Sequence, residues 1–227
     1  MKPKLRTILI GVTILFSILG LAVGIIYSPI LDVDKVVVIG APGRESEVLD
    51  AAKIKIGEPL LVGSITSSDN RVAGLPWVES ARLDRKLTGT ARLIVRSRTP
   101  VAYARTPEGS VGLIDKEGIV VAVVPTPPPG VPEIKNAGPV PVPGQKISAP
   151  DLVKVAASLG PLGARVAEIA ITDRQATLYL TAGPEVRFGG LDRLAEKAKS
   201  AEAALGAIGT KGFSYLDVRV PSGPVTG

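Results

Sequence analysis

A run of 20 residues without a charged side chain, Ile8 to Tyr27, constrains this chain more than any other feature. At about 1.5 Å of helical rise per residue it extends roughly 30 Å, the thickness of a bilayer's hydrocarbon core. A cleaved signal peptide is the alternative, but its apolar region is usually only about 7–15 residues long, and no small-x-small cleavage site follows this run. We therefore expect residues 8–27 to form a transmembrane helix that is retained as an anchor.

The charges on either side of this run predict its orientation. Three basic residues lie within residues 1–7, whereas residues 32–35 carry two acids and one base. Because basic residues favour the cytoplasmic side, residues 1–7 are expected to be a cytoplasmic tail and everything after the helix to be extracytoplasmic. The expected localisation is the cell membrane, as a single-pass protein.

The composition excludes several classes of function. The chain has no histidine and no cysteine, so it lacks the commonest metal ligand, the commonest general base and every Ser-His-Asp or Cys-His site. Its net charge is +6, of which the tail carries three, and the remaining charges are mixed in sign. We therefore expect no nucleic-acid partner, no cofactor and no metal site.

Residues 33–99 have the pattern of a small two-layer α/β domain. Apolar residues recur at helical spacing in one segment, a second segment is typical of a polar helix, and β-branched or alternating residues mark three strands. The expected order is strand Val33–Gly40, helix Arg44–Ile54, helix Thr66–Ala73, strand Trp77–Leu87 and strand Arg92–Arg98.

Residues 100–220 have a different pattern, with short strands separated by turns. A short helix and an amphipathic helix interrupt them, and a proline-rich stretch over residues 125–144 is expected to be an extended surface loop rather than a ligand motif. The expected strands are Val101–Arg105, Val111–Asp115, Ile119–Val123, Arg165–Thr172, Ala176–Thr181, Glu185–Phe188 and Tyr215–Val220, with helices over Asp151–Leu159 and Leu191–Leu205.

Possible catalytic constellations are weak. Ser64, Ser67 and Ser68 lie near two lysines in sequence, but nothing orients a nucleophile and a base there. The one tryptophan, Trp77, follows Leu75-Pro76 and is expected to be a core anchor, with a partner-binding role as the alternative. The sequence therefore predicts a protein that is not an enzyme.

Several short motifs follow one another along nearly the whole chain. They are Val36–Gly40, Glu47–Ala52, Gly57–Leu60, Leu75–Val78, Pro100–Ala102, Leu113–Val120 and Leu216–Arg219. Each motif is short, but their order resembles that of the FtsQ/DivIB family of bacterial cell-division proteins.

This resemblance completes the predicted fold and function. It implies an α+β chain with a single N-terminal transmembrane helix, a small βααββ POTRA domain (33–99), a larger, mostly antiparallel β domain with flanking helices (100–220) and a short tail (221–227). It also implies a non-catalytic divisome scaffold that binds FtsB/DivIC-type and FtsL-type proteins, and a septal peptidoglycan synthase as a further partner. The alternatives are a POTRA-bearing envelope secretion or transport component and, disfavoured by the missing histidine and cysteine, an envelope enzyme.

The expected partner site is the final strand. Tyr215–Val220 alternates apolar and polar residues, and a strand late in the chain can leave one edge unpaired, to which a partner's strand can be added. The resemblance points to the same strand; the alternative is that it only closes the sheet over Leu216 and Val218. The predicted partner-binding residues are Asp217, Val218, Arg219, Val220, Pro221, Ser222 and Gly223.

Overall fold

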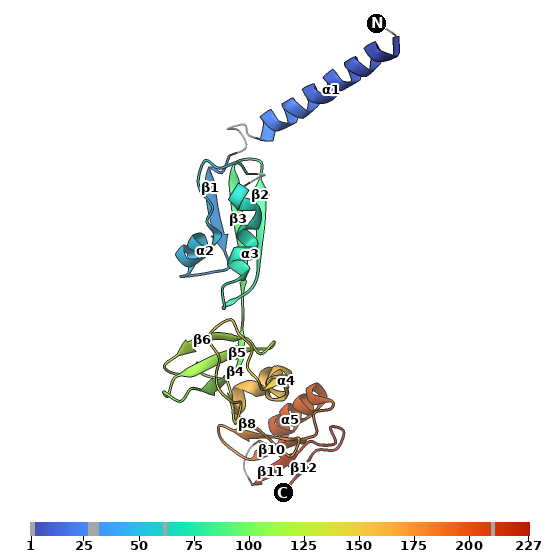
Figure 1. Ribbon diagram of the computed structural model, residues 1–227. Helices are drawn as coiled ribbons and strands as arrows, with labels where there is room; N and C mark the ends of the chain where they lie inside the picture. The colour runs from blue at the N-terminus through green and yellow to red at the C-terminus, as the bar shows by residue number, and fades with distance from the viewer. Residues whose placement is uncertain (1–2, 27–31, 61–62, 210–211) are drawn as a thin grey trace. The chain divides into compact units, whose positions relative to one another are not determined.

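The computed structural model describes residues 3–26, 32–60, 63–209 and 212–227. The chain divides into two compact units, Met1–Ser97 and Arg98–Gly227, and Figure 1 labels most of their helices and strands. We call them the small unit and the large unit and describe each by itself. The predicted limits of a POTRA domain at 33–99 and a β domain at 100–220 stay predictions.

The predicted transmembrane helix is wrong. A helix, α1 (Pro3–Ile26), does cover most of the apolar run. However, none of the helices that the described residues form is both long and apolar enough to cross a lipid bilayer. A crossing requires about 20 consecutive apolar residues. The side chains of α1 are described without interruption only over residues 10–21, and the predicted run ended at Tyr27, outside the described residues.

The rest of the small unit is a three-stranded sheet with helices beside it (Figure 1). The strand order is β1-β3-β2, in which β3 pairs in parallel with β1 and in antiparallel fashion with β2. The elements are β1 (Lys35–Ile39), α2 (Glu45–Ala52), the 3-10 helix η2 (Gly63–Ser67), α3 (Ser68–Ala73), β2 (Val78–Lys86) and β3 (Thr90–Ser97).

The alternation of β3 decides which face of this sheet is buried. Ala91, Leu93 and Val95 are buried, whereas the intervening Arg92 is exposed, because successive side chains of a strand point to opposite faces. Gly40 has a positive φ of 88°, and a Cβ there would meet the carbonyl oxygen of Val95, so a glycine is needed where the chain leaves β1.

The large unit is built on one nine-stranded sheet, with helices packed against it. The order is β12-β11-β10-β9-β8-β7-β4-β5-β6. The elements are β4 (Pro100–Arg105), β5 (Val111–Asp115), β6 (Val120–Val124), β7 (Glu133–Ile134), α4 (Pro150–Ser158), the 3-10 helix η3 (Gly160–Arg165), β8 (Val166–Thr172), β9 (Gln175–Leu180), β10 (Glu185–Gly189), α5 (Leu194–Ile208), β11 (Tyr215–Asp217) and β12 (Val225–Thr226).

A two-residue strand joins the halves of this sheet. β4, β5 and β6 form one antiparallel group, and β8, β9 and β10 form another. β7 pairs in parallel with both groups, through Tyr103↔Glu133 on one side and Ile134↔Ile169 on the other. β7 lies inside the proline-rich stretch, which was expected to be only a loop. Its pairing makes one sheet out of two local meanders.

One apolar core lies between the sheet and the two helices of this unit. Leu178 and Phe188 from the strands share a buried cluster with Val155 of α4 and Ala201 of α5, and all four are almost inaccessible to solvent. Alternation along the strands and helical spacing along α4 and α5 therefore turn their apolar faces toward one another. The sheet that this core supports ends in β12 on one side and in β6 on the other.

Candidate functional site

The candidate site is the end of the nine-stranded sheet formed by β11 and β12. β11 is shorter than predicted, because it ends at Asp217 rather than at Val220. It pairs in parallel with β10, through Glu185↔Tyr215, Val186↔Leu216 and Arg187↔Asp217. Leu216 and Val218 are fully buried, so this segment does close the sheet over the core.

β11 is not an edge strand, because the chain itself adds one more strand beside it. β12 runs antiparallel to β11, with Leu216 opposite Thr226 and Asp217 opposite Val225. The amide of Tyr215 donates to the carbonyl of Gly227 at 3.0 Å, and the amide of Gly227 donates to the carbonyl of Tyr215 at 3.2 Å. Among the described residues, β12 is the last strand at this end of the sheet.

The seven predicted partner-binding residues mostly form the connection between these two strands. Asp217 alone lies in a strand; the carbonyl of Val220 accepts from the amide of Gly223 at 3.1 Å in a tight turn. Ser200 of α5 donates its hydroxyl to the carbonyl of Pro221 at 2.7 Å, which fastens the connection to the helix. Val218 faces the core, whereas Arg219 and Val220 are exposed, Val220 by 58%.

An ion pair shapes the first part of the connection. The Arg219 guanidinium lies 2.6 Å from the Asp217 carboxylate, and the Arg219 amide donates to the same group at 3.0 Å. The hydrogen bond from the Arg219 side chain lowers the pKa of Asp217, outweighing the effect of burial, and the same pair raises the pKa of Arg219. The stem of Arg219 crosses Gly189, where a Cβ would meet its Cγ at 2.7 Å.

The neighbouring surface is aromatic and charged. The guanidinium of Arg187 lies 3.8 Å from the centroid of the Tyr215 ring, and it pairs with Glu185 at 2.7 Å. Arginine and tyrosine are enriched in protein interfaces, because each offers apolar area together with hydrogen-bonding groups. The arrangement offers main-chain pairing and side-chain contacts. Within the described part of the chain, no group of acidic residues could hold a metal ion.

Sequence reasoning missed Val225 and Thr226. The signal was present, because Pro221-Ser222-Gly223-Pro224 is a turn composition, and two β-branched residues follow it. A two-residue strand gives too few positions for an alternation to be recognised, so the sequence predicts only a tail over residues 221–227. Its pairing depends on β11 being in place.

The sequence is similar to those of known proteins. The family description "Cell division protein FtsQ/DivIB, C-terminal" matches residues 102–219, just over half of the chain. A cell division protein FtsQ of Mycobacterium leprae is 33% identical over 98% of this chain and 66% of its own length. The FtsQ of Mycobacteroides abscessus is 33% identical over 97% of this chain and 69% of its own length.

A more distant relative extends the same result. FtsQ of Streptomyces bingchenggensis is 30% identical over 98% of this chain and 86% of its own length. The chain spans about two thirds of the length of the two mycobacterial relatives. The predicted resemblance is thus confirmed over nearly all of the sequence, and the chain belongs to the FtsQ/DivIB family of cell-division proteins.

Proposed function

We propose that this chain is a non-catalytic scaffold of the cell-division machinery, whose large unit binds a partner protein by accepting a β-strand at the β12 end of its sheet. The observation that carries the proposal is the sheet order, which leaves the outer side of β12 without a neighbouring strand among the described residues. Such an edge offers a row of N–H and C=O groups to an added strand.

The pairing pattern indicates which residue faces outward. Tyr215 and Gly227 exchange two hydrogen bonds, so the adjacent pair, Leu216 and Thr226, is the type that exchanges none. The N–H and C=O of Thr226 consequently point away from β11, toward an incoming strand. The main-chain contact therefore falls on a residue outside the predicted set.

The seven predicted residues supply the side-chain part of this proposal. Asp217, Arg219 and Val220 lie beside the edge, and the exposed residues of the set would contact a strand laid along β12. Arg219, held by Asp217, presents a fixed positive charge to the partner. Alternate side chains of an added strand give specificity, whereas its backbone gives affinity.

FtsB/DivIC-type and FtsL-type division proteins are the partners we propose, with a septal peptidoglycan synthase as a further one. Family membership and the relatives' common name, cell division protein, support this choice. We place the contact at the division septum, on the extracytoplasmic side of the cell membrane.

Replacing Thr226 with proline tests the strand-addition site. The substitution removes the outward N–H, and proline is tolerated on sheet edges when its missing donor faces solvent. The loss of one hydrogen bond, worth about 1 kcal/mol, predicts roughly fivefold weaker binding of a purified FtsB/DivIC-type partner by isothermal titration. Arg219→Glu tests the side-chain contact independently and should weaken binding by a similar or smaller factor.

Two controls make this test specific. Thr226→Ala keeps the N–H and should bind as the unchanged chain does, whereas Val225→Pro removes a donor on the β11 side and should loosen β12 itself. Unchanged affinity in both Thr226→Pro and Arg219→Glu would place the interface elsewhere. Recovery of translocation components in place of division proteins by the intact chain would favour a secretion or transport role.

A further inference from the structure

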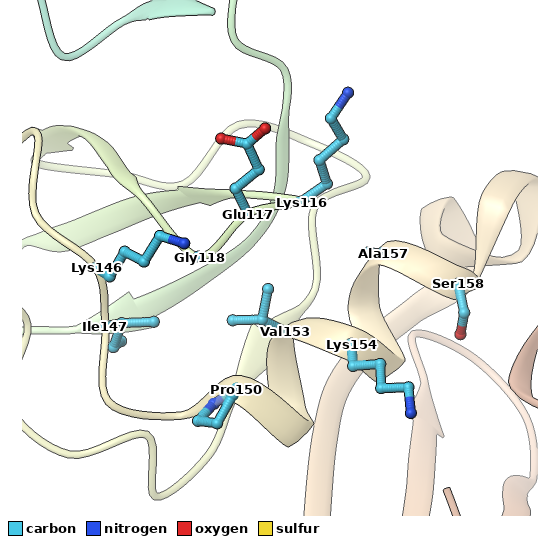
Figure 2. A pocket seen from close by; sticks show the side chains of 10 residues that line it. All are labelled: Lys116, Glu117, Gly118, Lys146, Ile147, Pro150, Val153, Lys154, Ala157 and Ser158. Carbon is cyan, nitrogen blue, oxygen red and sulfur yellow. The ribbon is translucent and has the colours of Figure 1, made fainter. Parts of the chain in front are cut away.

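A second concave surface lies at the other end of the large unit's sheet. It is a groove of about 450 Å³ between the turn that joins β5 to β6 and helix α4 (Figure 2). Its principal lining residues are Lys146, Ile147, Pro150, Val153, Lys154 and Glu117. Because β5 and β6 end the sheet opposite to β12, this groove is separate from the strand-addition site.

The floor of the groove is apolar and fixed in place. Ile147 and Val153 are buried members of the main core, so their exposed atoms rest on a packed layer. The amide of Ile147 donates to the carbonyl of Gly118 at 2.9 Å, which ties the segment before α4 to the β5–β6 turn. A preformed floor of this kind can accept an aliphatic side chain without reorganising, which favours binding.

The rim of the groove carries a positive charge that the unit does not neutralise. Lys146 and Lys154 are both exposed, and neither forms an ion pair with any residue that the structure describes. Figure 2 shows the Lys146 amine extended toward the β5–β6 turn and Lys154 projecting from α4. Glu117 is the one acid among the described lining residues, and it is already held by Arg98 at 3.0 Å.

Arg98 itself belongs to a compact charged cluster. Its guanidinium also pairs with the buried carboxylate of Asp115 at 2.5 Å, and the Asp115 carboxylate accepts from the amides of Glu117 and Ile119. Glu117 is therefore committed to Arg98 and offers little attraction to the lysines. The lysines of the lining outnumber its one acid, and this excess of positive charge favours an anionic ligand.

We propose that this groove binds an acidic segment of a partner protein, with one aliphatic side chain seated between Ile147 and Val153 and flanking carboxylates paired with Lys146 and Lys154. The positive charge of the lysines favours an acidic ligand. The apolar floor favours a peptide over an anionic polymer of the cell wall, because a peptide can supply an aliphatic side chain. A phosphate-bearing or sugar polymer would use the lysines but leave the floor without an apolar partner.

The experiment uses the full chain with labelled isoleucine and valine methyl groups. The probe is a short blocked peptide of alternating glutamate and leucine, compared with polyglutamate of the same length and with inorganic polyphosphate. We expect the peptide to bind and to shift the methyl signals of Ile147 and Val153. Its affinity should fall as the salt concentration rises, since exposed ion pairs are screened.

Charge reversals provide the matched comparison. Lys154→Glu should weaken the peptide about threefold, and the double variant K146E/K154E about tenfold, in keeping with the modest strength of exposed ion pairs. Lys199→Glu, an exposed position on α5, makes the same change of charge away from the groove and should leave binding unaltered. Thr226→Pro should also leave it unaltered, because it acts at the opposite end of the sheet.

Four results would overturn the proposal. Equal affinity for polyglutamate would show that the apolar floor is not used, and tighter binding of polyphosphate would make the groove a polymer site. An equal loss of peptide affinity in Lys199→Glu and Lys154→Glu would show that only the overall charge of the unit matters. Peptide binding without shifts at Ile147 and Val153 would place it on another surface.

Discussion

The small and the large unit are both sheets packed on helices, but a polar contact of a buried side chain lies in a different place in each. In the small unit one such contact lies at the edge of the core, where the Trp77 indole donates to the Glu47 carboxylate at 2.9 Å and Arg44 covers the ring at 4.8 Å. Trp77 is only 6% exposed, in keeping with the expected core anchor.

In the large unit one such contact lies in the middle of the sheet. Glu133 of β7 is buried, and its carboxylate accepts from Tyr103 at 3.3 Å and from Arg105 at 3.1 Å, and pairs with Lys135 at 3.0 Å. Burial raises the pKa of Glu133, but the hydrogen bond and charge of Lys135, with those of Arg105, outweigh it and hold that pKa below its usual value. In β7 an ionised carboxylate, Glu133, is thus paired with basic side chains, whereas the next residue, Ile134, packs into the apolar core.

The largest expected effect is in the apolar core of the large unit. Phe188→Ala removes the largest fully buried side chain and should lower the free energy of unfolding of that unit by about 3–5 kcal/mol. Trp77, the one tryptophan, lies in the small unit, so its fluorescence reports that unit alone. In urea, the circular dichroism transition should move while the tryptophan transition stays in place. A matched shift of both transitions would mean that the two units unfold as one.

The control for this prediction is Val123→Ala on β6. Val123 is 44% exposed, so its truncation should change the stability by no more than about 0.5 kcal/mol.

A smaller effect is expected at the β7 joint. Glu133→Gln should cost about 1–3 kcal/mol near neutral pH, because a charged acceptor with several donors is replaced by a neutral one. Since the folded pKa is depressed, the carboxylate stabilises the unit above its unfolded pKa of about 4.3, and this contribution is lost as pH falls through the lower folded pKa. The unchanged protein and Glu133→Gln should therefore differ less in their free energy of unfolding, measured in urea, at acidic pH.

Glu168→Gln is the matched control at the joint. Glu168 reaches Lys135 only at 3.5 Å and its side chain is one-third exposed, so its replacement should cost about 0.5 kcal/mol. A pH-independent loss in Glu133→Gln would contradict the role given to the charge of Glu133.

The smallest expected effect is at the Trp77 contact. Glu47→Ala removes the acceptor of the indole N–H and should destabilise the small unit by about 1 kcal/mol, visible as an earlier tryptophan transition in urea. Glu45→Ala removes the other acid in the first turn of α2 and so makes the same change near the helix N-terminus without touching Trp77. Equal shifts in both variants would assign the effect to the helix dipole.

The sequence alone determined most individual elements, because their signals are local. The apolar alternation of Leu93 and Val95 marked β3, and the helical spacing of Leu194, Ala198 and Ala201 marked α5. The sequence alone also predicted the family correctly, because that prediction depends on the order of short motifs. The length of an uncharged run, however, did not suffice to establish a membrane crossing, and that prediction was wrong.

Only the tertiary structure decided where the sheet joins and where it ends. β7 and β12 are two residues each, too short to carry a periodic pattern, and their strand conformation comes from neighbours distant in sequence: Tyr103 and Glu168 for β7, and Leu216 for β12. A short segment gains too little from local hydrogen bonds to order itself, so it becomes a strand when a preformed edge supplies its partners. For that reason the proposed strand-addition edge is β12, at Thr226, and not the predicted strand that ends at Val220.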